Sequence, residues 1–514
     1  MNAFLLLEGR EWVREKLPSP GQEEIVRDLE LEWIFAAMAQ RDPSIRDVVE
    51  AVMLESLGDP ADIRYRQEIF ADCVAHRAVI ERVSVIAEDA LAGERKIYRS
   101  SLRRPSSTLA RAVEVLEGFL DSLRELRVLA GTERRTFSSG GLSSFFERIV
   151  ADLDEGYLRA LEEHMDQLRF REGVVMSAAL GPFAKGARYA VRMPERVKKS
   201  RRAVRAEARA WNSFEIAPRD DIGSQILMEL KDRAISDVTE VLANACDHIR
   251  EFFELLHRDL AFYRGCMNLW DELRGTGQPT CKPVALPVGG NTLLCEDVRD
   301  VALALRAAGK VVGNDVHAEG KSLIVVTGAN SGGKSTFLRS IGQAQVMLQC
   351  GMFVCAKAFS SGTSCGLFSH FVREEDRKMV SGRLDEELKR MSSMIDEMSA
   401  GGMLLMNESF ASTTEREGSE IATNVIRGLV DSNVRVVVVT HLYEFAERLC
   451  AERPEWATFL RADRGDGGER SFKITEGPPL PSSFGLDILS RYGGWHDDLG
   501  RDAHRRGPGP AGTG

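Results

Sequence analysis

A glycine-rich segment in the last third of the chain carries residue types that bind phosphate. Gly328-Ala-Asn-Ser-Gly-Gly-Lys334-Ser335 has P-loop spacing, with an apolar run over 322–327 before it and a helical pattern to about Cys350 after it. Glycines let consecutive backbone N–H groups turn toward one anion, and a helix N-terminus adds positive potential. Lys334 is expected to reach the β- and γ-phosphates, and the Ser335 hydroxyl to ligate Mg²⁺. The segment predicts ATP binding by Gly328, Ala329, Asn330, Ser331, Gly332, Gly333, Lys334, Ser335 and Thr336.

A second motif follows about 70 residues later, where an apolar run over 403–406 ends in Asn407 and Glu408. A P-loop ATPase places an acidic pair here, one residue in the Mg²⁺ shell and the next on the attacking water. We expect Glu408 to polarise that water and Asn407 to act on Mg²⁺ partly through water. An asparagine adds no charge, so weaker Mg²⁺ affinity or slower turnover is expected. The alternative for Glu408 is an ordinary carboxylate at a strand end.

The third motif is the β-branched run over 434–440, which delivers His441 to a strand end. Open α/β sheets bind ligands at that edge, so His441 is expected to sense the γ-phosphate, although a lone histidine is more often structural. Three motifs in this order match the ABC-type ATPases, whose sites are completed by a second subunit. The segment 409–418 opens a helix, and Thr413 is expected to contact the partner's nucleotide.

The elements that position these motifs differ between the two halves of the chain. Short β-branched runs alternate with helical patterns beyond a Gly- and Pro-rich loop at 275–283, which predicts a mostly parallel sheet. Residues 1 to about 275 are predicted to be almost entirely helical. The clearest pattern, 222–273, predicts one helix on the order of 75 Å long. Two helices broken near Asn244 are the alternative.

A basic stretch precedes that helix. Residues 185–209 hold ten Lys or Arg against two acids in a chain with a net charge of −10. The functional interpretation is sequence-independent contact with DNA phosphates, and the alternative is a solvated helix face. The candidate DNA contacts are Lys198, Lys199, Arg201, Arg202 and Arg205.

Composition sets broad limits. A chain of 514 residues predicts two to four domains, and 43% hydrophobic with 28% charged residues is typical of a soluble globular protein. No stretch approaches the roughly 18–20 apolar residues of a membrane helix, and the N-terminus does not resemble a signal peptide. The nine cysteines show no metal-binding spacing. We therefore expect a cytoplasmic protein, nucleoid-associated if bacterial, with reduced thiols and no membrane partner.

The motifs resemble those of the MutS family of DNA mismatch-repair ATPases. The similar segments are 327–339 around the P-loop, 312–316 with its Asn-Asp pair, 350–354, the glutamate-rich 384–398 and 440–444. The resemblance is specific over about 310–445 and architectural over 30–275. Asn407 departs from the family's Asp, and only Thr413 remains of its Gly-x-Gly-Thr signature. The resemblance implies a short MutS-related protein lacking the N-terminal mismatch-recognition domain.

The implied domains are a helical core or lever region (1–100), long lever helices with a clamp-like basic segment (101–275), a P-loop ATPase domain (284–492) and a disordered tail (493–514). The implied function is that of a homodimeric ATPase that couples ATP hydrolysis to clamp movements on duplex, mismatched or branched DNA, in mismatch repair or recombination, with repair proteins as partners. One rival is a nucleotide-gated scaffold with little turnover. The other, a coiled-coil DNA-repair ATPase, is disfavoured by the modest helical length.

Overall fold

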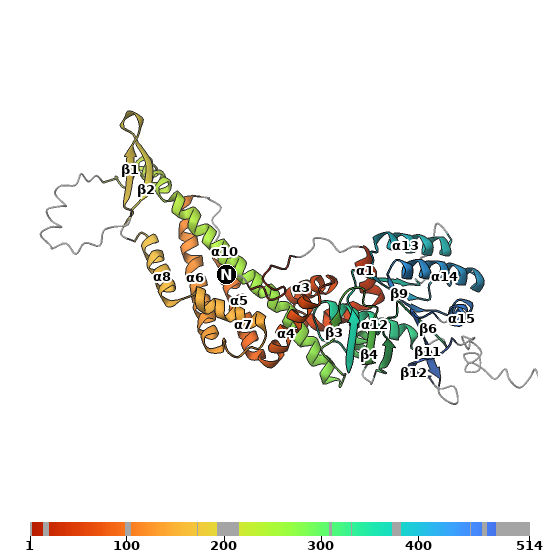
Figure 1. Cartoon of the computed structure of the whole chain (residues 1–514). Helices are drawn as coiled ribbons and strands as arrows, with labels where there is room; N and C mark the ends of the chain where they lie inside the picture. Colours follow the sequence, from red (N-terminus) through yellow and green to blue (C-terminus); the bar gives the residue numbers. More distant parts are fainter. Residues whose placement is uncertain are drawn as a thin grey trace, which may run out of the picture. The chain divides into compact units, whose positions relative to one another are not determined.

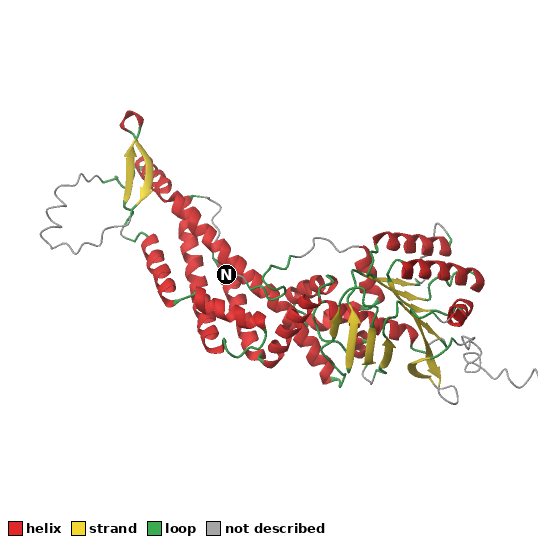
Figure 2. Ribbon diagram, in the orientation of Figure 1, coloured by secondary structure: helices red, strands yellow, loops and turns green. Residues whose placement is uncertain are grey.

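The computed structural model describes residues 3–13, 20–97, 104–171, 173–192, 215–307, 311–329, 332–372, 382–452, 454–464 and 470–479. The chain forms two compact units. Figure 1 colours the chain along its sequence, and Figure 2 colours it by secondary structure. Unit 1 comprises Met1–Leu5 and Ala75–Leu260, and unit 2 comprises Leu6–Val74 and Ala261–Gly514. Most of unit 1 is therefore inserted, along the sequence, into unit 2. The predicted tail, 493–514, lies outside the described residues.

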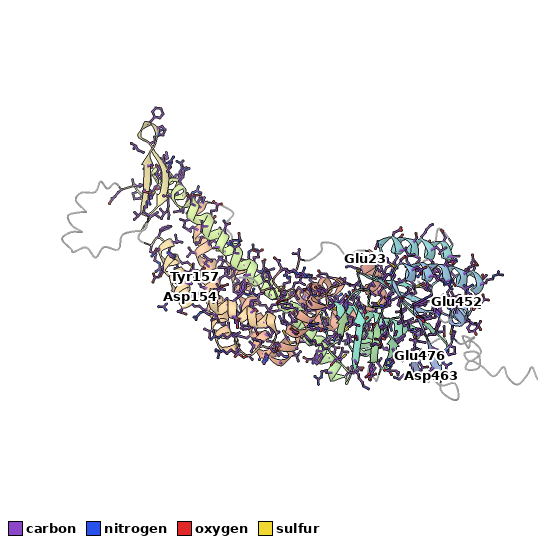
Figure 3. The ribbon with its side chains drawn as sticks, viewed as in Figure 1. Glu23, Asp154, Tyr157, Glu452, Asp463 and Glu476 are labelled. Carbon is purple, nitrogen blue, oxygen red and sulfur yellow. The ribbon has the colours of Figure 1, made fainter. Side chains whose placement is uncertain are left out.

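Unit 1 is built mainly from helices around an aromatic core. Its elements are α5 (Arg77–Lys96), α6 (Pro105–Glu133), α7 (Gly140–Asp152), α8 (Glu155–Leu168), β1 (Met176–Leu180), the 3₁₀ turn η1 (Pro182–Ala184), β2 (Gly186–Val191) and most of α10 (Asp221–Gly275). The rings of Phe119 and Phe253 join α6 to α10, with centroids 5.6 Å apart. Asp154 is the N-cap of α8, and its carboxylate accepts a hydrogen bond from the Tyr157 backbone N–H at 2.9 Å; both residues are labelled in Figure 3. Such a cap satisfies an N–H group that the helix leaves unpaired.

The predicted long helix is confirmed: α10 is one α-helix of 55 residues, about 80 Å at 1.5 Å per residue. A break near Asn244 is wrong. Apolar residues repeat along its whole length, but burial is uneven. Phe253 and Leu256 are fully buried, whereas Ile222, Ile226 and Val241 are exposed.

The prediction of an almost entirely helical first half is wrong at residues 176–191. Strands β1 and β2 form an antiparallel hairpin there, with Met176 opposite Val191. The alanines of this segment favour a helix, but Gly181 and Pro182 interrupt the chain between them. Proline cannot continue a helix that precedes it, and glycine weakens one. This Gly-Pro turn signal was in the sequence and outweighs the alanine propensity.

Unit 2 contains both helices and strands, as its alternating pattern predicts. Its elements before α10 are α1 (Pro20–Asp28), α2 (Leu31–Ala39), α3 (Pro43–Leu54) and α4 (Pro60–Ala75). After α10 come β3 (Val284–Leu286), β4 (Leu293–Val298), α11 (Val301–Arg306), β5 (Asn314–Ala318), β6 (Leu323–Thr327), α12 (Lys334–Gln349), β7 (Ala358–Gly362), β8 (Leu367–Phe371), α13 (Arg383–Glu397), β9 (Met403–Asn407), α14 (Glu415–Asp431), β10 (Arg435–Val439), α15 (Tyr443–Glu452), β11 (Ala457–Arg464) and β12 (Arg470–Glu476).

The larger sheet of unit 2 has the strand order β12-β11-β6-β10-β9-β8. Strands β8, β9, β10, β6 and β11 pair in parallel and only β12 is antiparallel, which confirms a mostly parallel sheet. Alternate strand residues such as Leu323, Leu404 and Val436 pack in one cluster with residues of α13, α14 and α15. On the other side, α12 contacts β9 and β10. The central strands are buried on both faces, which explains their continuous apolar sequences.

A second, smaller sheet with the order β3-β7-β4-β5 was not predicted. Arg435 connects it to the larger sheet. From the start of β10, its buried guanidinium donates to Thr292 O at 2.9 Å and to Gly362 O at 3.1 Å. Within the described ranges no carboxylate is among its hydrogen-bond acceptors, and burial lowers the pKa of Arg435 to about 10.

The N-terminal helices belong to unit 2 through specific polar contacts. Arg66 is fully buried and donates to Leu6 O at 2.7 Å and to Cys350 O at 3.3 Å. Gln349 at the end of α12 donates to Leu57 O at 3.1 Å. These contacts join the first seventy residues to the segment that follows the P-loop. Within the part of the chain that the structure describes, no helix is long and apolar enough to cross a membrane.

Candidate nucleotide-binding site

The glycine-rich loop connects β6 to α12, as predicted. Gly328 has φ 114° and Gly333, the N-cap of α12, has φ 90°. A Cβ added to Gly328 would lie 3.0 Å from Ala462 N, so both the backbone conformation and the available space require glycine there. Asn330 and Ser331 lie outside the described residues.

Lys334 lies at the start of α12 and folds back on its own loop. Its Nζ donates to Gly328 O at 2.8 Å and to Ala329 O at 3.1 Å, and the residue is 4% exposed. Burial lowers the pKa of Lys334, and the negative charge of Glu408 partly opposes that shift. The ammonium group is thus held at the loop in a poorly solvated place, where an anion would stabilise its charged form.

Ser335, Asn407 and Glu408 meet at the carboxyl-terminal edge of the larger sheet. The Ser335 hydroxyl donates to Asn407 Oδ1 at 2.9 Å, although the two residues are 72 positions apart. Glu408 follows β9 with φ 57°, and its backbone N–H donates to Val439 O of β10 at 2.8 Å. The left-handed turn, uncommon for a residue with a side chain, redirects the chain where the carboxylate is presented.

A cavity of about 380 Å³ lies beside these residues. Its lining includes the polar or charged residues Lys334, Ser335, Thr336, Glu408 and Asn314 together with Gly333, Leu303, Ala307, Val311, Val312 and Phe472. A lining that combines charged and apolar side chains suits a ligand with a charged end and a flat, weakly polar end.

Sequence reasoning assigned no role to Asn314 or Phe472. The Asn314 amide joins β5 to β12, because its Oδ1 accepts from Ile474 N at 2.8 Å. The Val-Gly-Asn-Asp segment marks Asn314 in the sequence but indicates no role for its side chain. Phe472 lies on β12, in no motif, and nothing in the sequence distinguished it.

His441 and Thr413 are not among the side chains that line this cavity. His441 is exposed just after β10. Thr413 lies in the segment before α14, and the residue that caps this helix is its neighbour Thr414, whose Oγ1 accepts from Glu417 N. Glu387 of α13 orders the segment by accepting from Phe410 N at 2.6 Å and from Ser412 Oγ at 2.8 Å.

The basic stretch is described only in part. Lys198, Lys199, Arg201, Arg202 and Arg205 lie outside the described residues. Lys185, Arg188 and Arg192, at the beginning of the stretch, are exposed on or beside the β1–β2 hairpin of unit 1. In its described portion the stretch is therefore an extended ribbon and not a solvated helix face.

Two family models match separate parts of the sequence. Residues 58–276 match the MutS2 N-terminal domain, and residues 324–488 match MutS domain V, the part that contains the P-loop and the Asn407–Glu408 motif. The chain belongs to the MutS family. Within this family, the helical first half and the β6-to-β12 sheet of the present chain thus correspond to two recognised domains.

Individual MutS-family relatives resemble shorter parts of the chain. The DNA mismatch repair protein MutS of Synechococcus sp. (strain CC9605) is 28% identical over 249 residues, which are 46% of this chain and 27% of that protein. Endonuclease MutS2 of Streptococcus equi subsp. equi (strain 4047) is 27% identical over 135 residues, 26% of this chain and 17% of that protein. MutS protein homolog 4 of Mus musculus is 27% identical over 139 residues, 27% of this chain and 14% of that protein. The chain thus aligns with about a quarter or less of the length of these relatives.

Proposed function

We propose that this MutS-family chain binds and hydrolyses ATP and couples that cycle to contact with DNA. The observation that carries the proposal is the convergence of Lys334, Ser335, Asn407 and Glu408 at one sheet edge beside a cavity. Two segments of the sequence, 328–335 and 407–408, supply the glycine loop, a buried cation, oxygen ligands and a carboxylate. Phosphoryl transfer needs this combination, since its catalysis consists mainly of positioning and charge stabilisation.

Each residue has a defined task in the proposal. Lys334 exchanges the carbonyls of Gly328 and Ala329 for phosphate oxygens, which removes the cost of its burial. Glu408 orients a water molecule toward the γ-phosphate and takes up its proton, so that ADP and phosphate leave. His441, at the end of the neighbouring strand, reports the presence of the γ-phosphate.

The donor set fits Mg²⁺. Ser335 Oγ and Asn407 Oδ1 are neutral oxygen ligands in contact, and Mg²⁺ is usually held by one or two protein groups together with phosphates and water. Among the described residues, no group of three or more His, Cys, Asp or Glu side chains could hold a metal ion. The two oxygens would therefore hold the ion only together with a nucleotide, and the ion would neutralise phosphate charge.

The proposed wider role is repair or recombination of DNA by a homodimer. The names of the relatives, the composite sites of ABC-type ATPases and the exposed basic residues of unit 1 support it. In this proposal residues 284–492 form the motor and residues 101–275 the lever and clamp. Repair proteins are its expected partners and the cytoplasm, on the nucleoid in a bacterium, its expected location.

A second candidate is a nucleotide-gated scaffold that binds ATP but turns over little. Asn407 favours it, because the side chain that accepts the Ser335 hydroxyl carries no charge. The segment at Ala411 and Ser412 favours it as well, since it lacks the glycines of the family signature.

Steady-state ATPase rates distinguish the two candidates. For a motor, Glu408→Gln should lower kcat by roughly 10²–10⁴-fold while ATP still binds, because proton transfer is lost and the phosphate contacts remain. Lys334→Ala should abolish binding, and Asn407→Asp should raise Mg²⁺ affinity. A wild-type rate no higher than that of Glu408→Gln leaves only the scaffold.

DNA binding is tested on the same protein. Reversing the charge of Lys198, Lys199, Arg201, Arg202 and Arg205 should weaken binding to linear, mismatched and branched DNA alike. The dependence of affinity on salt should also become less steep, since fewer counterions are released. Unchanged affinity and salt dependence would remove the basic stretch from the proposal.

A further inference from the structure

The turn of the β1–β2 hairpin exposes two large apolar side chains. Phe183 is 96% exposed and Leu180 is 83% exposed. In Figure 1 this turn points away from the helices of unit 1. Neither side chain therefore contributes to the core of unit 1.

The backbone presents Phe183 in an uncommon conformation. Its φ is 57°, in the left-handed region that residues with a bulky side chain rarely adopt. The turn is closed by a hydrogen bond from Gly181 N to Lys185 O at 2.7 Å. The other aromatic residue of the hairpin, Tyr189, behaves differently, because its ring covers Gly186. Among the residues that the structure describes, Phe183, unlike Tyr189, has no packing role that would explain an aromatic residue at a strained position.

The charge around the turn is of one sign. From residue 174 to residue 192 the sequence contains Lys185, Arg188 and Arg192 and no Asp or Glu. All three cations are exposed, and Arg192 Nε donates to Ser177 Oγ across the hairpin at 2.8 Å. The remaining side chains are mostly small, so the hairpin forms a narrow basic ribbon with an apolar end.

An aromatic tip followed by a basic strand fits nucleic acid better than protein. Bases offer flat apolar faces and phosphates offer negative charge, and proteins that bind single strands combine aromatic stacking with a positive surface. Protein interfaces are depleted of lysine at their centre, whereas surfaces that bind nucleic acid carry an excess of positive charge. The absence of acids from the hairpin thus favours DNA as the occupant.

We propose that Phe183 stacks on a base exposed in single-stranded or branched DNA, with Leu180 against the same base step and Lys185 and Arg188 on the adjoining phosphates. The inference rests on the proposed DNA-binding function and adds a specificity to it. In a continuous duplex both faces of each base are covered by its neighbours. The hairpin would therefore distinguish forks and single strands from intact duplex.

The full-length protein should be titrated with three fluorescent DNAs of equal length: a duplex, a single strand and a fork. Phe183→Ala should weaken binding to the single strand and the fork by roughly 5- to 150-fold, the range for one stacked base. Duplex binding should change less than twofold, and Phe183→Trp should restore the preference. Val128→Ala, which removes an apolar side chain 65% exposed on α6, is the matched control and should change nothing.

The other outcomes separate the inference from the function on which it rests. Equal loss on all three DNAs, or no loss, overturns base stacking while DNA binding stands. If the wild type binds none of them, both proposals fall. If Phe183→Ala leaves DNA affinity intact but changes the oligomeric state in light scattering, the tip is a protein contact and the inference is wrong.

Discussion

The buried cations of unit 2 and the exposed hairpin of unit 1 place polar and apolar side chains in opposite environments. Lys334 is 4% exposed and Arg435 is 5% exposed, and both are held by several backbone carbonyls. Phe183 is 96% exposed, with no side chain packed on it to fix its position. A buried polar network fixes geometry before a ligand arrives, whereas an exposed apolar tip gains its contacts only from a partner. Substitutions should therefore be costly to folding in the first region and nearly neutral in the second.

The largest effect is expected at Arg435. Arg435→Ala removes the donor to Thr292 O and Gly362 O and leaves these carbonyls without it in a buried place, so unit 2 should lose about 3 kcal/mol or more. Arg159→Ala in unit 1 is the control: its side chain is 69% exposed and lies 4.0 Å from Glu155, a contact worth less than about 1 kcal/mol. Urea denaturation of both variants gives the comparison, and equal midpoints would contradict it.

The next prediction compares a glycine-to-alanine substitution in each unit. The substitution should lower ATP affinity in unit 2 and raise folding stability in unit 1. Gly328→Ala forces a side chain into φ 114° against Ala462, so ATP affinity should fall by tenfold or more, from a strain of about 1–3 kcal/mol. Gly118→Ala in α6 meets open space and has no such backbone constraint. It should stabilise unit 1 by about 0.5–1 kcal/mol, because alanine is the better helix former. Binding of a fluorescent ATP analogue and thermal unfolding measure the two, and a loss of stability at Gly118 would contradict the comparison.

A pH dependence follows from the buried cation. The pKa of Lys334 in the folded protein lies below its usual 10.5, since burial disfavours the charged form. ATP affinity should be constant below that lowered pKa and fall by up to about tenfold per pH unit above it, beginning before pH 10.5. Folding stability should change in the opposite direction. Burial of the Lys334 cation destabilises the folded protein at lower pH, and this destabilisation is relieved as pH rises through the lowered pKa.

Fluorescent-nucleotide titrations between neutral and alkaline pH measure this fall. Lys334→Arg is the control, because a guanidinium keeps its charge over that range. The same midpoint in both proteins would assign the titration to another group.

The smallest effect is expected on the exposed face of α10. Val241→Ala should change stability by less than about 0.5 kcal/mol, because Val241 is 68% exposed. Val113→Ala, at a buried position in α6 of the same unit, should cost more than about 1 kcal/mol. Equal urea midpoints for the two variants would contradict this prediction and show that the exposed face of α10 is covered in solution.

The sequence predicted the parts of the molecule whose residues carry a local pattern. The runs at 322–327, 403–406 and 434–440 became adjacent parallel strands, because strands buried on both faces must be apolar throughout. The glycine spacing predicted the P-loop and the helix α12 that follows it. Because the strands before Ser335 and Glu408 both end at one edge of the sheet, their sequences predicted that Ser335 and Asn407 lie close together.

What could not be predicted depends on distant pairing. Phe472 reaches the cavity because β12 is antiparallel to β11, a register that no motif records. The smaller sheet joins β3 and β7, which lie about seventy residues apart in the sequence. At β1 the Gly-Pro turn signal shows that a helix is interrupted, but the pairing of Met176 with Val191 that makes the alanines a strand is not visible in the sequence. The predicted domain boundaries and the roles of individual site residues stay predictions.

The insertion of unit 1 into unit 2 has a consequence for how the chain is made. Arg66 needs Cys350 O, a partner 284 positions later, so the N-terminal helices emerge from the ribosome long before their binding surface exists. At roughly 5–20 residues per second this delay is on the order of 15–60 s. All residues of unit 1 precede position 261, so unit 1 can fold during that interval, while helices α1 to α4 wait with their apolar faces uncovered. The nucleotide centre would then be assembled last, and a slow stretch of translation before residue 350 would lengthen the exposure that a chaperone must cover.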